Sequence, residues 1–305
     1  GGKGTKVLCI GPAGENLVRF ASIVSDKGAI AGRTGMGTVM GAKRLKAVVA
    51  RGAGKVSVAD VRGLPKIRAK VLAKVKEAVV IQTLKSFGTA GSVYYNSLIG
   101  DMCVKNWRQG TFDDTALLGL DGTTMADTIL TGSYTCYACP VACKRVVEVK
   151  DGPFDMANGP GPEYESVQSF GPMFMNTGLT AVAKANDLCN RYGLDTISCG
   201  ATIAFAMEAA ERGLLKCDLA WGDAAAMVAM TEKIGRREGV GDLLAEGVHR
   251  VAAALGVPDA DWVPHVKGLE VPMHDPRTYH GLAVGYATCP RGANHNGAGI
   301  YIEMG

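Results

Sequence analysis

Three cysteines lie within eight positions, and this cluster constrains the fold more than any other feature of the chain. Cys136, Cys139 and Cys143 have the spacing C-x2-C-x3-C. Two thiolates two residues apart can bind one metal centre from a single turn, and a third thiolate can close the same face. The spacing therefore predicts an iron–sulfur cluster whose fourth ligand comes from elsewhere. A zinc site and chance burial of small apolar cysteines are the alternatives.

The composition indicates a globular protein. The chain has 305 residues, of which 47% are hydrophobic and 20% charged, enough for about two domains. A net charge of +4 without a basic tract gives no indication of a nucleic-acid partner. No apolar run approaches the roughly 20 residues that cross a bilayer. Nine cysteines, an odd number, fit metal ligation in a reducing cytoplasm better than disulfides.

The character of the chain changes along its length, which predicts an α+β fold. Residues 1–57 are expected to end a β-rich domain, with a buried strand at 5–10 and another strand at 45–49. Residues 58–262 are expected to form a mostly helical domain. Residues 263–305 are expected to be loops rich in Gly, Pro and His that begin a truncated third domain. The helices are expected at 64–85, 181–192, 196–213, 224–234 and 242–255. Since the chain lacks an initiator Met and stops within an element, we expect it to be an internal fragment.

Two segments carry ligand-binding patterns. The stretch Ala31–Gly37 fails the dinucleotide G-x-G-x-x-G pattern, but it places Arg33 among glycines, where backbone amides and a guanidinium can approach a phosphate. The alternative is a structural crossing. Between two predicted helices, Gly193 fits a left-handed C-terminal residue and Asp195 an N-cap. Amides at this helix start could bind an anion, or the two residues could be caps alone.

Acidic and histidine residues are candidates for proton transfer. Glu163 and Glu165 follow Gly161-Pro162, a turn signal, so one carboxylate can point into a site while the other is solvated or paired. His295 lies among amides and can serve as a proton donor, since its ordinary pKa is near neutral. His274 and His280 are competitors for this role.

Taken together and in this order, the motifs resemble the tungsten- or molybdenum-dependent aldehyde:ferredoxin oxidoreductase family. The matching segments are 11–16, 31–46, 104–107, 136–143, 161–166, 192–195 and 286–295. The resemblance implies an N-terminal β-domain on which two pterins rest, covered by two mostly helical domains.

The resemblance also implies roles for single residues. Cys136, Cys139 and Cys143 match three ligands of a [4Fe–4S] cluster. Glu165, or Glu163 if the alignment shifts, matches the acidic residue near the metal, and His295 matches the histidine that helps to orient or protonate substrate. The residues that match pterin contacts are Gly32, Arg33, Thr34, Asn190, Gly193, Leu194 and Asp195, with Asn190 in place of the family's Asp.

The implied activity is oxidation of an aldehyde to a carboxylic acid at a tungsten or molybdenum bis-pterin centre, with magnesium as a further ion that bridges the pterin phosphates. Electrons would pass through the cluster to ferredoxin or another electron-carrier subunit, and homo-oligomers are common in the family. The alternatives are an active-site subunit of a tungsten-dependent aryl-CoA reductase and a non-catalytic iron–sulfur or zinc protein. A radical-SAM enzyme is a weaker option, because its usual spacing is C-x3-C-x2-C.

Overall fold

The structure is a computed structural model that describes residues 4–26, 28–54 and 56–297. It combines small antiparallel sheets with many helices, which confirms the α+β class. The domain boundaries at 57 and 262 stay predictions. Within the described ranges, no helix is both long enough and apolar enough to cross a membrane.

The N-terminal part is a four-stranded antiparallel sheet in the order β3-β2-β1-β4. The strands are β1 (Thr5–Ile10), β2 (Ile23–Ser25), β3 (Ala29–Ala31) and β4 (Ala47–Arg51). Two short helices, α1 (Pro12–Glu15) and α2 (Met36–Ala42), pack against β1. The strand expected at 5–10 is present, but the expectation that it is buried is wrong, because Leu8 is exposed and Ile10 is the only buried residue of β1.

Helices make up most of the remaining chain, and two of the expected ones are broken. Residues 64–85 form α3 (Gly63–Glu77) and α4 (Val79–Phe87), separated by extended backbone at Ala78. The helix expected at 242–255 is interrupted at Gly247, where φ is +79°. The helices after α4 are α5 (Val93–Leu98), α6 (Asp114–Leu120), α7 (Gly122–Thr128), α8 (Tyr164–Phe170), α9 (Leu179–Tyr192), α10 (Thr196–Glu211), α11 (Ala224–Arg236), α12 (Val240–Leu244), α13 (Val248–Ala254) and α14 (His280–Thr288).

Two small sheets were not expected from the sequence, and helices α1, α2, α5 to α8 and α14 lie outside the five ranges expected to be helical. The first sheet holds β5 (Leu130–Tyr134), β6 (Lys144–Val149) and β7 (Met156–Pro160), and the cysteine cluster is the loop that joins β5 to β6. The second is the hairpin of β8 (His265–Val266) and β9 (Leu269–Glu270). The region after residue 263, expected to be loops, also contains α14.

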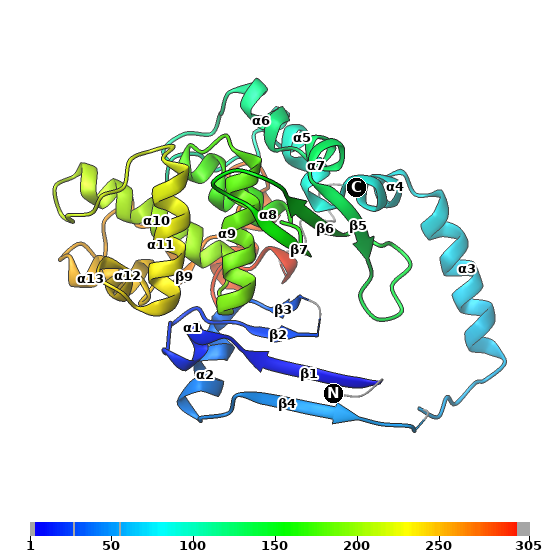
Figure 1. Ribbon diagram of the computed structural model, residues 1–305. Helices are drawn as coiled ribbons and strands as arrows, with labels where there is room; N and C mark the ends of the chain where they lie inside the picture. Colours follow the sequence, from blue (N-terminus) through cyan, green and yellow to red (C-terminus); the bar gives the residue numbers. More distant parts are fainter. Residues whose placement is uncertain (1–3, 27, 55, 298–305) are drawn as a thin grey trace.

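Helix α10 lies in the core, since all of its residues from Ile197 to Ala209 are buried. The N-terminal sheet joins this core through the turn between α9 and α10. Ser22 N–H donates to Gly193 O at 2.7 Å, and Asp195 N–H donates to Phe20 O at 3.1 Å. Figure 1 shows the sheet below the helices, with α9 above the left end of β2 and β3. This junction brings the segment after β3 to the start of α10.

Candidate active site

A cavity of about 520 Å³ lies where the segment after β3, the start of α8 and the start of α10 meet. Most of the candidate residues from the sequence line it. These are Gly32, Arg33, Thr34, Glu163, Glu165, Asn190, Leu194, Asp195 and His295. Gly193 and the three clustered cysteines are not among its lining residues.

Glu165 and His295 meet on the cavity wall. Glu165 lies in the first turn of α8, and its Oε2 accepts a hydrogen bond from the backbone N–H of Met273 at 2.7 Å. Its Oε1 lies 3.4 Å from His295 Nδ1, and within the described ranges neither atom has a hydrogen-bond partner. Burial lowers the pKa of His295 and so favours the neutral ring. A fixed carboxylate beside a neutral imidazole can exchange a proton with a bound molecule.

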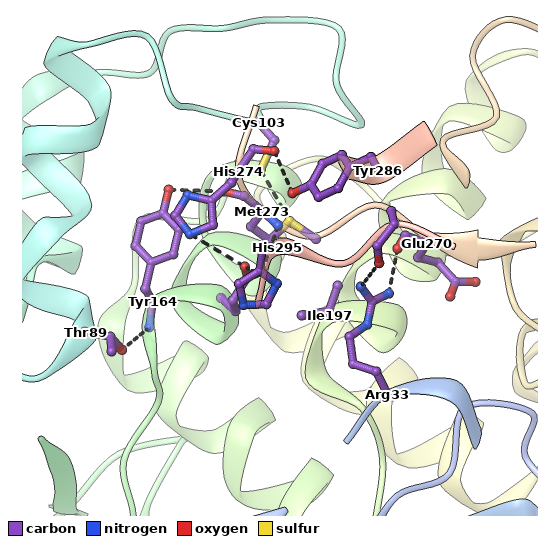
Figure 2. A network of polar contacts seen from close by, with 12 residues as sticks. Arg33, Thr89, Cys103, Tyr164, Ile197, Glu270, Met273, His274, Tyr286 and His295 are labelled. Carbon is purple, nitrogen blue, oxygen red and sulfur yellow. Dashed lines mark hydrogen bonds and ion pairs between the residues drawn. The ribbon is translucent and has the colours of Figure 1, made fainter. Parts of the chain in front are cut away.

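A second histidine approaches the same carboxylate oxygen. His274 Nε2 lies 3.8 Å from Glu165 Oε1, and His274 Nδ1 lies 2.6 Å from Asp101 Oδ2. The His274 ring stacks on Tyr164 with a centroid separation of 4.6 Å. Burial alone would lower the pKa of His274, but the hydrogen bond with Asp101 and the charge of Glu165 reverse the sign and raise it. Figure 2 shows His274 and His295 beside each other, with Arg33 on the far side of Ile197.

Glu163 has different neighbours from Glu165. It occupies the N-cap position of α8, and its Oε2 accepts a hydrogen bond from Thr89 Oγ1 at 2.6 Å. Burial, with a smaller contribution from the charge of Glu163, raises the pKa of Tyr134 to about 12 and also raises the pKa of Cys143. Because the helix starts between the two carboxylates, Glu165 is directed to the histidines and Glu163 to the side of the cysteine loop.

Arg33 and Asp195 form a nearly buried ion pair at the cavity wall. Arg33 Nε donates to Asp195 Oδ2 at 3.2 Å, and the Arg33 side chain is 10% exposed. Its two terminal nitrogens donate to Ala293 O at 3.1 Å and Glu270 O at 2.6 Å. A guanidinium carries five N–H hydrogens, so two remain for an anion. Asp195 also accepts from Ile197 N–H, which confirms it as the N-cap of α10.

Gly193 supports the site through its backbone. Its φ of +71° is left-handed, as predicted for the residue that ends α9. An added Cβ would lie 2.9 Å from Gly11 N, so a side chain would push the sheet away from α10. A direct contact between Gly193 and a pterin stays a prediction.

The cysteine cluster is a hairpin loop with three free thiols. Cys139 N–H donates to Cys136 O at 3.1 Å, which closes the expected turn around the first two cysteines. Cys136 is exposed, whereas Cys139 and Cys143 are half-buried. Considering only the part of the chain that the structure describes, no three His, Cys, Asp or Glu side chains are gathered closely enough to hold a metal ion. Cluster ligation by these thiols therefore stays a prediction.

Two residues that contribute to the site were missed by the sequence reasoning. Arg145 donates to the carbonyls of Cys143 and Ala142 in the cysteine loop and to Lys85 and Ser86 at the end of α4. Arg145 could have been identified from the sequence, because it lies two residues after the last cysteine of the cluster. Asp101 carried no such local signal, because its partner His274 is 173 positions away.

Comparison with known proteins agrees with this arrangement. The family model described as aldehyde ferredoxin oxidoreductase, domains 2 and 3, matches residues 66–304, and the model of the N-terminal domain matches residues 1–52. The chain belongs to the aldehyde ferredoxin oxidoreductase family. The resemblance stated from the motifs is thereby confirmed.

Individual relatives are similar over nearly the whole chain. A tungsten-containing aldehyde ferredoxin oxidoreductase of Pyrococcus furiosus is 39% identical over 97% of this chain and 49% of its own length. Another, from Thermococcus kodakarensis, is 37% identical over 95% of this chain and 48% of its own. A protein of Pyrococcus furiosus described as an aliphatic sulfonate oxidoreductase, WOR-like subunit, is 30% identical over 95% of this chain and 48% of its own. The chain therefore spans about half the length of these relatives.

A solved structure has the same fold. The active-site complex of a benzoyl coenzyme A reductase matches 94% of this chain and 45% of its own chain, with a TM-score of 0.77 and 24% sequence identity. At this identity the likeness bears on the fold alone.

Proposed function

We propose that this chain is part of an oxidoreductase that oxidises aldehydes to carboxylic acids at a tungsten, or molybdenum, bis-pterin centre. The observation that carries the proposal is a pair of buried, unpartnered atoms, Glu165 Oε1 and His295 Nδ1, on two residues that line the cavity. Buried polar atoms are rarely left unpaired without a reason. Relatives at 37–39% identity that are described as tungsten-containing support the choice of metal.

The residues present are compatible with such a cofactor. The cavity wall carries the Arg33 guanidinium with two N–H hydrogens to spare, and the lining also includes the cations Lys144 and Arg291. These groups could bind the pterin phosphates, with or without magnesium. Asn190, Leu194 and Asp195 line the same cavity and are the proposed pterin contacts. The cysteine loop presents three thiols for a [4Fe–4S] cluster.

The proton chemistry is assigned to residues of this chain. The Glu165 carboxylate accepts a proton from the hydrated aldehyde, while the neutral ring of His295 donates an N–H to the substrate oxygen. Met273 N–H holds the other Glu165 oxygen, so the carboxylate keeps one orientation. When bound, the metal–pterin centre would supply the two-electron oxidation, in which the hydrate loses two electrons and two protons. One proton goes to Glu165 and the second, from the C–H bond, to solvent, while the electrons would leave through the cluster to ferredoxin or another electron-carrier subunit.

The first test is elemental analysis of the complete protein purified without oxygen. About four Fe with W or Mo per subunit is the expected result. Zinc, or iron without W or Mo, would refute the catalytic proposal and favour the non-catalytic alternative.

The second test assigns the base. Glu165→Gln and His295→Asn should each lower turnover about 10²- to 10⁴-fold at unchanged metal content. Glu77→Gln, at an exposed position of α3, is the matched control. Loss of turnover in Glu163→Gln but not in Glu165→Gln would transfer the role to Glu163.

Turnover assays with the same purified enzyme can determine the substrate class. The relative described as an aliphatic sulfonate oxidoreductase makes aliphatic sulfonates the second substrate class to assay. Reduction of an aryl-CoA thioester remains the third. Turnover of aldehydes well above the other two classes is the expected result.

A further inference from the structure

A buried carboxylate and a histidine lie behind Glu165 and are not used in the proposed chemistry. Asp101 is fully buried, and its Oδ1 accepts a hydrogen bond from Asp275 N–H at 2.6 Å. Its Oδ2 lies 2.6 Å from His274 Nδ1. The opposite edge of the His274 ring faces Glu165 Oε1, with Nε2 at 3.8 Å. Asp101, His274 and Glu165 therefore form a continuous line that ends at the cavity.

Among the groups around Asp101 and Glu165, His274 is the one whose positive charge can balance the negative charges of the two carboxylates. Of the nearby charges, Asp275 is paired with Arg277 at 2.6 Å. The groups that face the His274 ring and its backbone are the Tyr164 ring, the His295 ring, the Tyr286 hydroxyl and the Cys103 thiol with its Met273 contact. These groups are uncharged near neutral pH, since burial raises the pKa of the tyrosines and of Cys103 and lowers that of His295.

We propose that Asp101 and His274 are a positioning pair, in which a protonated His274 held by Asp101 keeps Glu165 ionised and directed at the cavity. The inference rests on the proposed function and adds two residues to its machinery. The two histidines then have separate tasks, because His274 stays an imidazolium while His295 stays neutral and contacts the substrate. In the proton transfer, Glu165 gains the proton that the substrate hydroxyl loses, and His274 keeps its own. The opposite directions of the pKa shifts of His274 and His295 agree with this division.

The decisive variant is Asp101→Asn in the complete, metal-loaded enzyme. The amide oxygen still accepts from Asp275 N–H, but the neutral side chain no longer favours a charged His274. Activity that needs protonated His274 is present below the pKa of His274 and is lost as the pH rises through it. Removal of the Asp101 charge lowers that pKa, so the alkaline limb of kcat should move about one to two pH units toward acid. KM and the tungsten and iron contents should not change.

A second variant and a control keep the test independent of one substitution. His274→Asn should lower kcat at unchanged KM, and the alkaline limb of its pH profile should disappear. His280→Asn, at an exposed position six residues further along the chain, should leave the profile as in the wild type. If Asp101→Asn fails to fold, His274→Asn decides alone. Wild-type kcat and pH profiles in these variants would overturn the inference.

Infrared titration separates this inference from the proposed function. The imidazole ring band of His274, identified by its loss in His274→Asn, should report deprotonation at a lower pH in Asp101→Asn than in the wild type. This readout does not depend on turnover. An enzyme without tungsten or molybdenum that still shows the band shift would refute the function and support the pair. An active enzyme whose band does not shift would support the function and refute the positioning pair.

Discussion

Replacement of Asp195 should destabilise the protein far more than replacement of an ordinary N-cap. Asp195 caps α10 and pairs with Arg33, whose side chain is only 10% exposed. Loss of a cap costs about 1 kcal/mol. Removal of one partner of a buried ion pair costs about 3–5 kcal/mol, and the low end applies here because two carbonyls also accept from Arg33. Asp195→Ala should therefore lose about 4 kcal/mol of unfolding free energy, by these estimates.

Two further variants separate the cap from the charge. Asp195→Asn keeps a good cap and should lose only the ion-pair part, about 3 kcal/mol. Asp223 caps α11 in the same way but is exposed, so Asp223→Ala should lose about 1 kcal/mol. Urea unfolding of the complete protein, compared at equal m-values, measures all three variants. Equal losses in Asp195→Ala and Asp223→Ala would show that the Arg33–Asp195 pair does not stabilise the fold.

Three other substitutions follow from the structure. Gly200→Ala places a Cβ 2.5 Å from Ser169 O and should lose about 1–3 kcal/mol in urea unfolding, whereas Gly119→Ala, in open space on α6, should gain about 0.5–1 kcal/mol. Burial, aided by the neighbouring His249, lowers the pKa of His265. Since the unfolded chain then binds a proton before the folded one, the free energy of unfolding should fall as the pH drops below about 6.5. His265→Gln should remove that fall, as measured by unfolding at several pH values. Arg145→Lys cannot hold four carbonyls in a planar fork and should lower the iron content in elemental analysis, while wild-type iron would contradict its role as loop anchor.

Local patterns in the sequence were sufficient for features that depend on neighbouring residues. Gly193 ends α9 in the left-handed conformation and Asp195 caps α10, as predicted, because caps are formed within one turn of the helix. Other local signals were present but weak. In β6 (Lys144–Val149) the burial alternates along the strand, but the sequence alternates apolar and polar only over Val147, Glu148 and Val149. The residues of α14 (His280–Thr288) lie in a stretch expected to be loops because it is rich in Gly, Pro and His, and they lack the clear polar face that would have indicated a helix.

The sequence by itself determined the family, through motifs whose order is preserved, and the types of residue available for the chemistry. Only the tertiary structure decided which of them meet. It placed Glu165 rather than Glu163 against the histidines, and it joined Asp101 to His274 across 173 positions. The physical reason is that a hydrogen bond or ion pair between distant segments depends on how sheet and helices pack. No periodicity or spacing along the chain records that packing.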